Sequence, residues 1–252
     1  MELHRLNPVT LIVGVASRFG AERARDLARR SQGGLLLADP DEGALCAIAD
    51  DLEANNLSPE RVSTLAFDPG DAARWAQAEA FIDAQYGRLD WAFIHPHTAS
   101  ASDLVEFRPR APLDYDALAL TLQTVTAIMR KNLQGGAVIV GLQASALPTA
   151  DAAAAFEDML INADAVAGDA VRINVIVLGG LHAPLWAAAP LLQDLVVECG
   201  DLRAAFDRIA ADNWRATRCS PALGMARLTA ALLSDDCSLS CGIVAVDGDQ
   251  SM

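Results

Sequence analysis

Short apolar runs alternate with longer helix-like segments along almost the whole chain, and no other feature restricts its fold as strongly. Each run is four to eight residues long, and most are followed by glycine, aspartate or proline, which are typical of turns. Uninterrupted apolar runs of this length are typical of strands that are buried on both faces. We predict strands at Val9–Val13, Leu35–Ala38, Val62–Phe67, Leu89–Ile94, Ala137–Val140, Val171–Leu178 and Gly242–Val246.

The segments between these runs carry helical patterns of ten or more residues. We predict helices at Ala21–Arg30, Asp41–Ala54, Ala72–Tyr86, Leu113–Lys131, Ala150–Val166 and Pro221–Leu233. Strands that alternate with helices pair in parallel, and the helices cover both faces of the sheet. The sequence therefore predicts an α/β fold: a doubly wound, Rossmann-like parallel sheet of about seven strands with helices on both faces. We expect a single domain over residues 1–252, with a helical lid excursion at 181–219.

Composition excludes several classes of protein. The 252 residues are 52% hydrophobic, which is too apolar for a disordered chain. No apolar run reaches the ~18 residues that a membrane-spanning helix needs. Thirty-three acidic residues against nineteen basic ones give a net charge of −14, which argues against nucleic acid or a membrane surface as a partner.

The five cysteines are scattered and form no CxxC pair, so we expect no metal site and a reducing compartment. The first residues lack the basic end and the long apolar stretch of a signal peptide. We therefore expect a cytoplasmic protein.

A glycine-containing turn follows the first predicted strand. Gly14 and Gly20 bracket it, and Ser17, Arg18 and Phe19 lie between them. Glycines permit a tight bend here, and the free N–H groups at the start of the next helix favour a phosphate. Arg18 stands where such loops usually have a middle glycine. It either pairs with a pyrophosphate or fills the cleft.

Six segments in this order resemble the short-chain dehydrogenase/reductase family. They are LIVGVASRFG at 11–20, LADPDE at 37–42, Phe67-Asp68, Leu89-Asp90, VRINVI at 171–176 and GIVAVDG at 242–248. The likeness covers nearly the whole chain and implies the fold described above. It also implies a nicotinamide cofactor held by Gly14, Ser17, Arg18, Phe19, Gly20, Asp39 and Asp68.

The resemblance makes NAD the candidate cofactor and disfavours NADP. An acidic residue at the end of the second strand binds the adenosine ribose and repels a 2′-phosphate, and Asp39 holds that position. Asp68 matches the aspartate that contacts adenine in the family. The alternative for both aspartates is that they cap the helices that follow.

The resemblance also locates the catalytic positions, and this chain departs from the family at all of them. The family uses a serine, a tyrosine thirteen residues later and a lysine four residues after that; the matching residues here are Gln143, Phe156 and Leu160. Shifting the alignment places neither a tyrosine nor a lysine at the family's positions. Both tyrosines, Tyr86 and Tyr115, precede the fifth predicted strand, and Lys131 is the only lysine.

Other residues could replace the missing acid and base. His95 and His97 follow the fourth strand, and imidazoles titrate near neutral pH. Tyr115, Asp114 and His182 are further candidates. The alternative for the histidines is a structural or surface role.

Two interpretations remain. The first is a divergent family member that keeps the fold without ordinary dehydrogenase chemistry and has a non-catalytic or binding role. The second is an NAD-dependent oxidoreductase, or a non-redox enzyme, that uses replacement acid and base residues in the same cleft. In either case we expect a small-molecule ligand and a homo-oligomer, dimer or tetramer, formed through helices 113–131 and 150–166.

Overall fold

The computed structural model describes residues 7–55, 58–96, 113–132, 135–143, 146–147, 149–178 and 228–246. The side chains of residues 18, 19, 143, 150, 178, 245 and 246 are not described. The expected lid at 181–219 lies outside the described residues, as do the sequence candidates His97 and His182. None of the helices in the described ranges is both long and apolar enough to cross a membrane.

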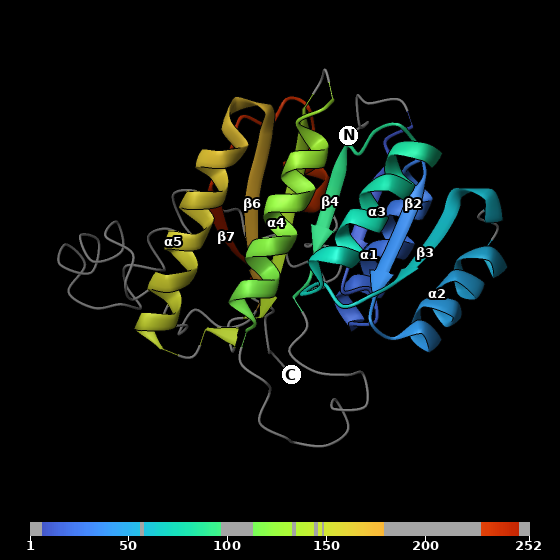
Figure 1. Ribbon diagram of the computed structural model, residues 1–252, viewed down its shortest axis with the longest axis horizontal. Coiled ribbons are helices and arrows are strands. Elements are labelled where there is room, and N and C mark those ends of the chain that lie inside the picture. The colour runs from blue at the N-terminus through green and yellow to red at the C-terminus, as the bar shows by residue number, and fades with distance from the viewer. Residues whose placement is uncertain are drawn as a thin grey trace.

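Seven parallel strands form one sheet in the order β3-β2-β1-β4-β5-β6-β7 (Figure 1). This confirms the predicted doubly wound, Rossmann-like α/β fold. The strands are β1 Thr10–Val13, β2 Leu35–Asp39, β3 Val62–Ala66, β4 Trp91–Ile94, β5 Gly136–Gln143, β6 Val171–Leu178 and β7 Gly242–Val246.

β5 is longer than the sequence predicted. The predicted strand was Ala137–Val140, but β5 pairs with β6 along its full length, up to Gln143 opposite Leu178. Gly141 lies within the strand, at a position too crowded for a side chain. A Cβ there would lie 2.9 Å from the ring of Phe93. The glycine thus makes room for a neighbouring aromatic side chain and does not mark the end of the strand.

The helices follow the predicted pattern. They are α1 Arg18–Arg30, α2 Glu42–Ala54, α3 Ala72–Gln85, α4 Tyr115–Met129 and α5 Ala150–Ala167, with short 3-10 turns η1 Pro59–Arg61 and η4 Gly168–Ala170. A further helical segment is described at 228–233. α1 begins three residues earlier than expected, because Ser17 accepts a hydrogen bond from the N–H of Gly20 and caps the helix there.

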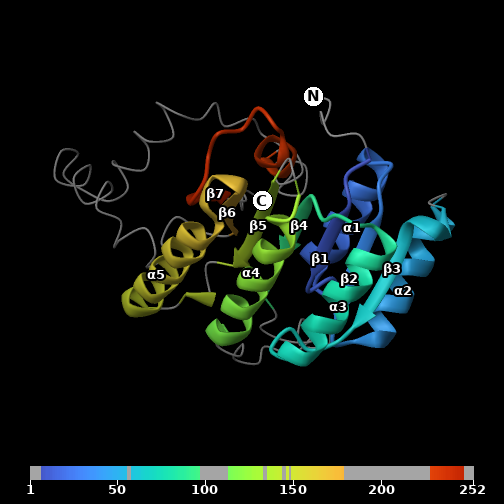
Figure 2. The ribbon, with the colours of Figure 1, turned by 45° about the horizontal axis from the view of Figure 1, so that its top comes forward.

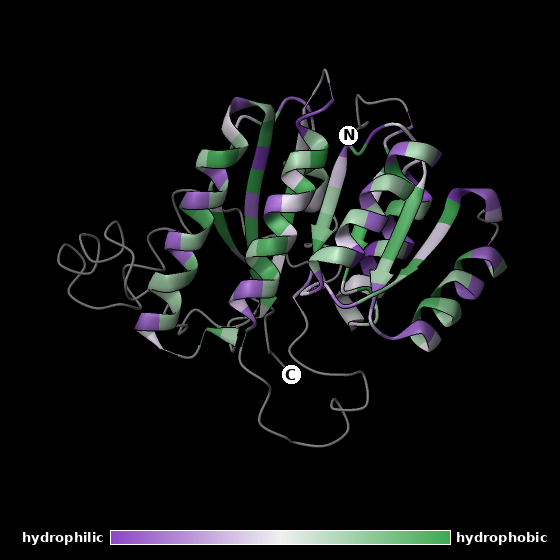
Figure 3. Ribbon diagram, in the orientation of Figure 1, coloured by the Kyte–Doolittle hydropathy of each residue, from purple (hydrophilic) through white to green (hydrophobic). Residues whose placement is uncertain are grey.

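The core has two layers, one on each face of the sheet. On β1, Leu11 and Val13 belong to one cluster and Ile12 to the other, as expected for side chains that alternate along a strand. The first cluster packs under α3, α4 and α5, which lie on the near face in Figure 1. The second packs under α1, α2 and segment 228–233, the last shown in red in Figure 2. Figure 3 shows the strands as mainly hydrophobic.

Candidate functional site

The strand order reverses direction between β1 and β4. These two strands are neighbours, but their following connections lead to opposite sides of the sheet. In open α/β sheets, ligands bind at such a switch point, at the edge where the strands end (the carboxyl edge). A cavity of about 120 Å³ lies there. It is lined by Val13, Gly14, Asp68, Pro69, Ile94, His95, Pro96, Asp114, Ala117, Leu118 and Thr121.

Gly14 and Gly20 are both required by close backbone packing in the turn after β1. Gly14 has a positive φ of +79°, and a Cβ on it would lie 1.9 Å from the carbonyl oxygen of His95. A Cβ on Gly20 would lie 2.3 Å from the carbonyl oxygen of Gly14. No other residue type fits either position without moving the backbone.

Ser17 uses its hydroxyl within the turn. Its Oγ donates to the carbonyl oxygen of Gly14 at 2.8 Å and accepts from the N–H of Gly20 at 3.0 Å. These bonds hold the turn in a helix-starting conformation. The side chains of Arg18 and Phe19 lie outside the description, so their predicted roles stay predictions.

Asp39 is buried at the end of β2, with a relative exposure of 1%. Its Oδ2 accepts from the N–H of Ala16 at 2.9 Å, and its Oδ1 accepts from the N–H of Asp41 at 3.0 Å. The N-cap of α2 is Asp41, which accepts from the N–H of Ala44, so the alternative that Asp39 caps this helix is wrong. The carboxylate therefore lies against the glycine turn.

Asp68 lines the cavity from the chain segment after β3. Its Oδ1 accepts from the N–H of Gly70 at 2.9 Å. The N-cap of α3 is Asp71, which accepts from the N–H groups of Ala73 and Arg74. Asp68 thus shapes a tight turn and does not cap the helix.

His95 is the one sequence-predicted histidine that the structure describes, and it is buried. Its Nδ1 lies 2.6 Å from the carbonyl oxygen of Gly141 on β5. A carbonyl oxygen only accepts, so Nδ1 carries the proton in this contact. The bond fixes the orientation of the imidazole at the wall of the cavity.

Asp114 and Tyr115 begin α4 with structural bonds. Asp114 caps the helix by accepting from the N–H of Ala117 at 2.9 Å, and it also lines the cavity. The Tyr115 hydroxyl donates to the carbonyl oxygen of Ala152 at 2.8 Å and joins α4 to α5. Burial raises the pKa of Tyr115, so the phenol stays protonated at neutral pH.

The positions matched to the family's tyrosine and lysine are hydrocarbon in the core. Phe156 has no exposed surface and Leu160 is 2% exposed, and both belong to the cluster under α5. Gln143, at the serine position, is the last residue of β5. Within the described ranges, no group of three or more His, Cys, Asp or Glu side chains is arranged to hold a metal ion.

Apart from the sequence candidate Asp114, one face at the start of α4 was missed as part of the site. Asp114, Ala117, Leu118 and Thr121 line the cavity together. Their spacing of three, four and seven residues from Asp114 places them on one helix face, a signal that the sequence carries. The hydrogen bond between His95 and Gly141 leaves no comparable signal in the sequence, because the two residues are 46 positions apart in the chain.

Comparison with known proteins gives the fold. The sequence matches no protein-family model and no curated protein. A short-chain type dehydrogenase/reductase from Mycobacterium ulcerans matches with a TM-score of 0.65 at 19% identity, covering 99% of this chain and 91% of its own. A 3-ketoacyl-ACP reductase from Sinorhizobium meliloti 1021 matches with a TM-score of 0.63 at 18% identity, over 96% and 98%.

A third structure, 7α-hydroxysteroid dehydrogenase, was solved with NADH and 7-oxo glycochenodeoxycholic acid. It matches with a TM-score of 0.60 at 16% identity, over 97% of this chain and 95% of its own. At such identities, the likeness shows a shared fold and does not by itself assign a function.

Proposed function

We propose that this chain is a divergent short-chain dehydrogenase/reductase that keeps the fold and a nucleotide-binding edge but does not carry out ordinary dehydrogenase chemistry. One observation carries the proposal. Phe156 and Leu160, one helical turn apart on α5, are buried hydrocarbon at the positions where the resemblance places the proton donor and the cation.

Reduction of a carbonyl by hydride needs a proton at the carbonyl oxygen. A tyrosine hydroxyl supplies that proton when a nearby cation lowers its pKa. The Phe156 ring has no hydroxyl, and the Leu160 side chain has no charge. Neither residue can hold or move a proton.

Lys131 cannot replace the missing cation, because it lies at the opposite edge of the sheet. It follows the end of α4, a helix whose first turn lies at the cavity. The fifteen residues of α4 span roughly 22 Å at ~1.5 Å per residue. Lys131 Nζ instead lies 2.8 Å from Glu79 Oε1 and 2.8 Å from Asp83 Oδ2 on α3.

Of the two nicotinamide cofactors, NAD fits better the residues present at the carboxyl edge of the sheet. Gly14, Ser17 and Gly20 preserve the turn, and Asp39 places a carboxylate against it. In this proposal the glycine loop with Arg18 and Phe19 holds the pyrophosphate, Asp39 the ribose and Asp68 the adenine side. NADP is disfavoured because the negative charge of Asp39 at the end of β2 would repel a 2′-phosphate. A bound nicotinamide group would supply a hydride, but Phe156 and Leu160 would supply no proton to go with it.

We further propose that two copies of the chain associate through α4 and α5. These helices lie side by side on the near face in Figure 1. On α5, Ile161 and Val166 are 57% and 53% exposed, and exposed Ala154, Ala155 and Ala165 lie on the same helix. Small side chains allow helices to approach closely, and exposed branched side chains gain from being covered.

A second candidate function has one specific observation in its favour. His95 lines the cavity with its imidazole orientation fixed by Gly141, and Asp68 and Asp114 line the same cavity. An oriented imidazole near carboxylates can act as a general acid or base. This supports an NAD-dependent or non-redox enzyme that uses His95 as the replacement residue.

Calorimetric titration with NAD⁺ and NADP⁺ tests the ligand assignment. We expect saturable binding of NAD⁺ and at least tenfold weaker binding of NADP⁺, which is ~1.4 kcal/mol of discrimination. Equal affinities would remove Asp39 from the ribose position. Saturable turnover of a small molecule that is lost in His95→Asn, with NAD⁺ affinity retained, would favour the second candidate.

A further inference from the structure

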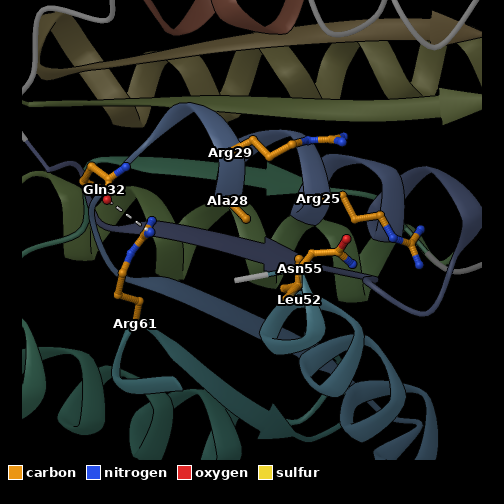
Figure 4. A pocket seen from close by; sticks show the side chains of 7 residues that line it. All are labelled: Arg25, Ala28, Arg29, Gln32, Leu52, Asn55 and Arg61. Carbon is orange, nitrogen blue, oxygen red and sulfur yellow. Dashed lines mark hydrogen bonds between the residues drawn. The ribbon is translucent and has the colours of Figure 1, made fainter. Parts of the chain in front are cut away.

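A second cavity lies at the edge of the sheet where the strands begin. Its volume is about 350 Å³. It is lined by Arg25, Ala28, Arg29, Gln32, Leu52, Asn55 and Arg61, and we call it the arginine pocket (Figure 4). These residues lie near the ends of α1 and α2 and in η1, directly before β2 and β3. The glycine turn follows the end of β1, so the two sites lie at opposite edges of the sheet.

The lining of the arginine pocket contrasts with the composition of the chain. Acidic residues outnumber basic ones by thirty-three to nineteen, yet three arginines and no acidic residue line this cavity. Arg25 and Arg29 lie four residues apart on one face of α1, and Gln32 follows just after the helix ends. Leu52 and Asn55 face them from α2, and Arg61 closes one end (Figure 4).

Arg61 donates hydrogen bonds to residues just after the C-terminal end of α1. Its Nε donates to the carbonyl oxygen of Gly33 at 3.1 Å, and its guanidinium also bonds the carbonyl oxygen of Ser31 and the side chain of Gln32. These bonds offset the partial negative charge at the helix end. Burial lowers the pKa of Arg61, and the group keeps its charge, since arginine is not deprotonated in proteins.

The other two arginines retain donors. Arg25 pairs with Asp51 through its Nε at 2.6 Å, which leaves the N–H groups of Nη1 and Nη2. Arg29 forms no ion pair or hydrogen bond with any described residue of the chain. Three cations are thus balanced by one carboxylate, and Arg29, an exposed residue of the lining, has no partner among those residues.

We propose that the arginine pocket binds a small polyanion carrying phosphate or carboxylate groups. Guanidinium groups match both oxyanions through paired N–H bonds. A volume of about 350 Å³ lies within the ~300–1,000 Å³ range of small-molecule sites. The arginine pocket is separate from the carboxyl edge of the sheet, and the proposal does not depend on NAD binding there.

Calorimetry with the full chain tests this proposal, using pyrophosphate and citrate as separate probes at constant ionic strength. We expect saturable binding of at least one probe with a Kd below about 1 mM. Binding of pyrophosphate alone assigns a phosphate ligand, and binding of citrate alone assigns a polycarboxylate. Arg29→Gln should weaken binding about tenfold or more, because a charge-assisted pair is lost, while NAD⁺ affinity is unchanged.

Arg74→Gln is the matched control. Arg74 is an exposed arginine on α3 outside the pocket, so its removal changes the net charge equally and should alter affinity by no more than about twofold. Arg29→Gln should fold with a wild-type Tm, since its guanidinium bonds no described residue. Absence of saturable binding by both probes up to about 10 mM would overturn the proposal. So would equal affinity in wild type and Arg29→Gln, or equal loss in both variants.

Discussion

The carboxylate of Asp39 joins the end of β2 to the glycine turn by accepting the backbone N–H of Ala16 at 2.9 Å. Its second oxygen accepts the N–H of Asp41 at 3.0 Å. The residue that the family resemblance assigns to the ribose therefore also fixes the shape of the turn. Loss of this carboxylate should affect both the stability of the fold and the nucleotide edge.

Asp39→Asn tests this double role. The amide can present only one oxygen, so one partly buried N–H loses its charged acceptor, at about 1.5–3 kcal/mol of unfolding free energy. Urea denaturation should show that loss, together with weaker NAD⁺ binding. Asp41→Asn is the control, because asparagine caps helices as well as aspartate and residue 41 is exposed. Unchanged stability in Asp39→Asn would refute the role.

Gly14→Ala should destabilise the fold strongly. The new Cβ would overlap the carbonyl oxygen of His95, and φ at this position is +79°. We expect a loss of at least ~3 kcal/mol, which is in the range of severe backbone strain. Gly43→Ala on α2 should be neutral or stabilising, since its nearest neighbour would be 3.4 Å away. Equal denaturation midpoints for the two variants would contradict the assigned packing.

Ile161→Glu tests association through α5. A buried charge at a two-fold interface faces its own copy, so the variant should shift to monomer at concentrations where the wild type is a dimer or larger. Sedimentation velocity measures this shift. Phe81→Glu on α3, also at an exposed apolar side chain, should leave the oligomer intact. A wild-type monomer, or the same oligomer in Ile161→Glu, would exclude this interface.

Glu157→Gln should raise stability at neutral pH. Burial raises the pKa of Glu157, and the neighbouring Asp158 raises it further. The native state therefore binds the proton more tightly than the unfolded chain, and stability falls as pH rises from about 4.3 through the native pKa.

The glutamine variant avoids that loss. At pH 7 its Tm should exceed that of the wild type by no more than about 2–4 °C, and near pH 3 the two should coincide. Thermal denaturation at both pH values checks this. A difference that is independent of pH would show that the glutamate charge is not its source.

The order and type of the elements could be predicted because most of the apolar runs are followed by turn residues. β6 and β7 have the predicted bounds. The end of β5 was missed because Gly141 looks like a turn residue, although it only makes room for Phe93. Local signals mark turns well, whereas packing between distant strands leaves no local pattern.

The candidate site was only partly predictable. The glycine turn and Asp39 follow from their positions at the ends of strands, but the capping role that the sequence left open for Asp39 belongs to Asp41, two residues later. The arginine pocket joins α1 to Arg61 across some thirty residues. The spacing of Arg25 and Arg29 places them together, and only the fold brings Arg61 to them.

Hydride transfer by the wild-type protein tests the central claim most directly. NADH oxidation and alcohol formation should be followed together with several carbonyl probes, including a 3-ketoacyl thioester and a 7-oxo bile acid. Phe156→Tyr should be measured alongside, because it restores the hydroxyl while Leu160 still lacks the cation. We expect no alcohol above the protein-free reaction for either protein. Saturable, equimolar NADH oxidation and alcohol formation by the wild type would contradict it.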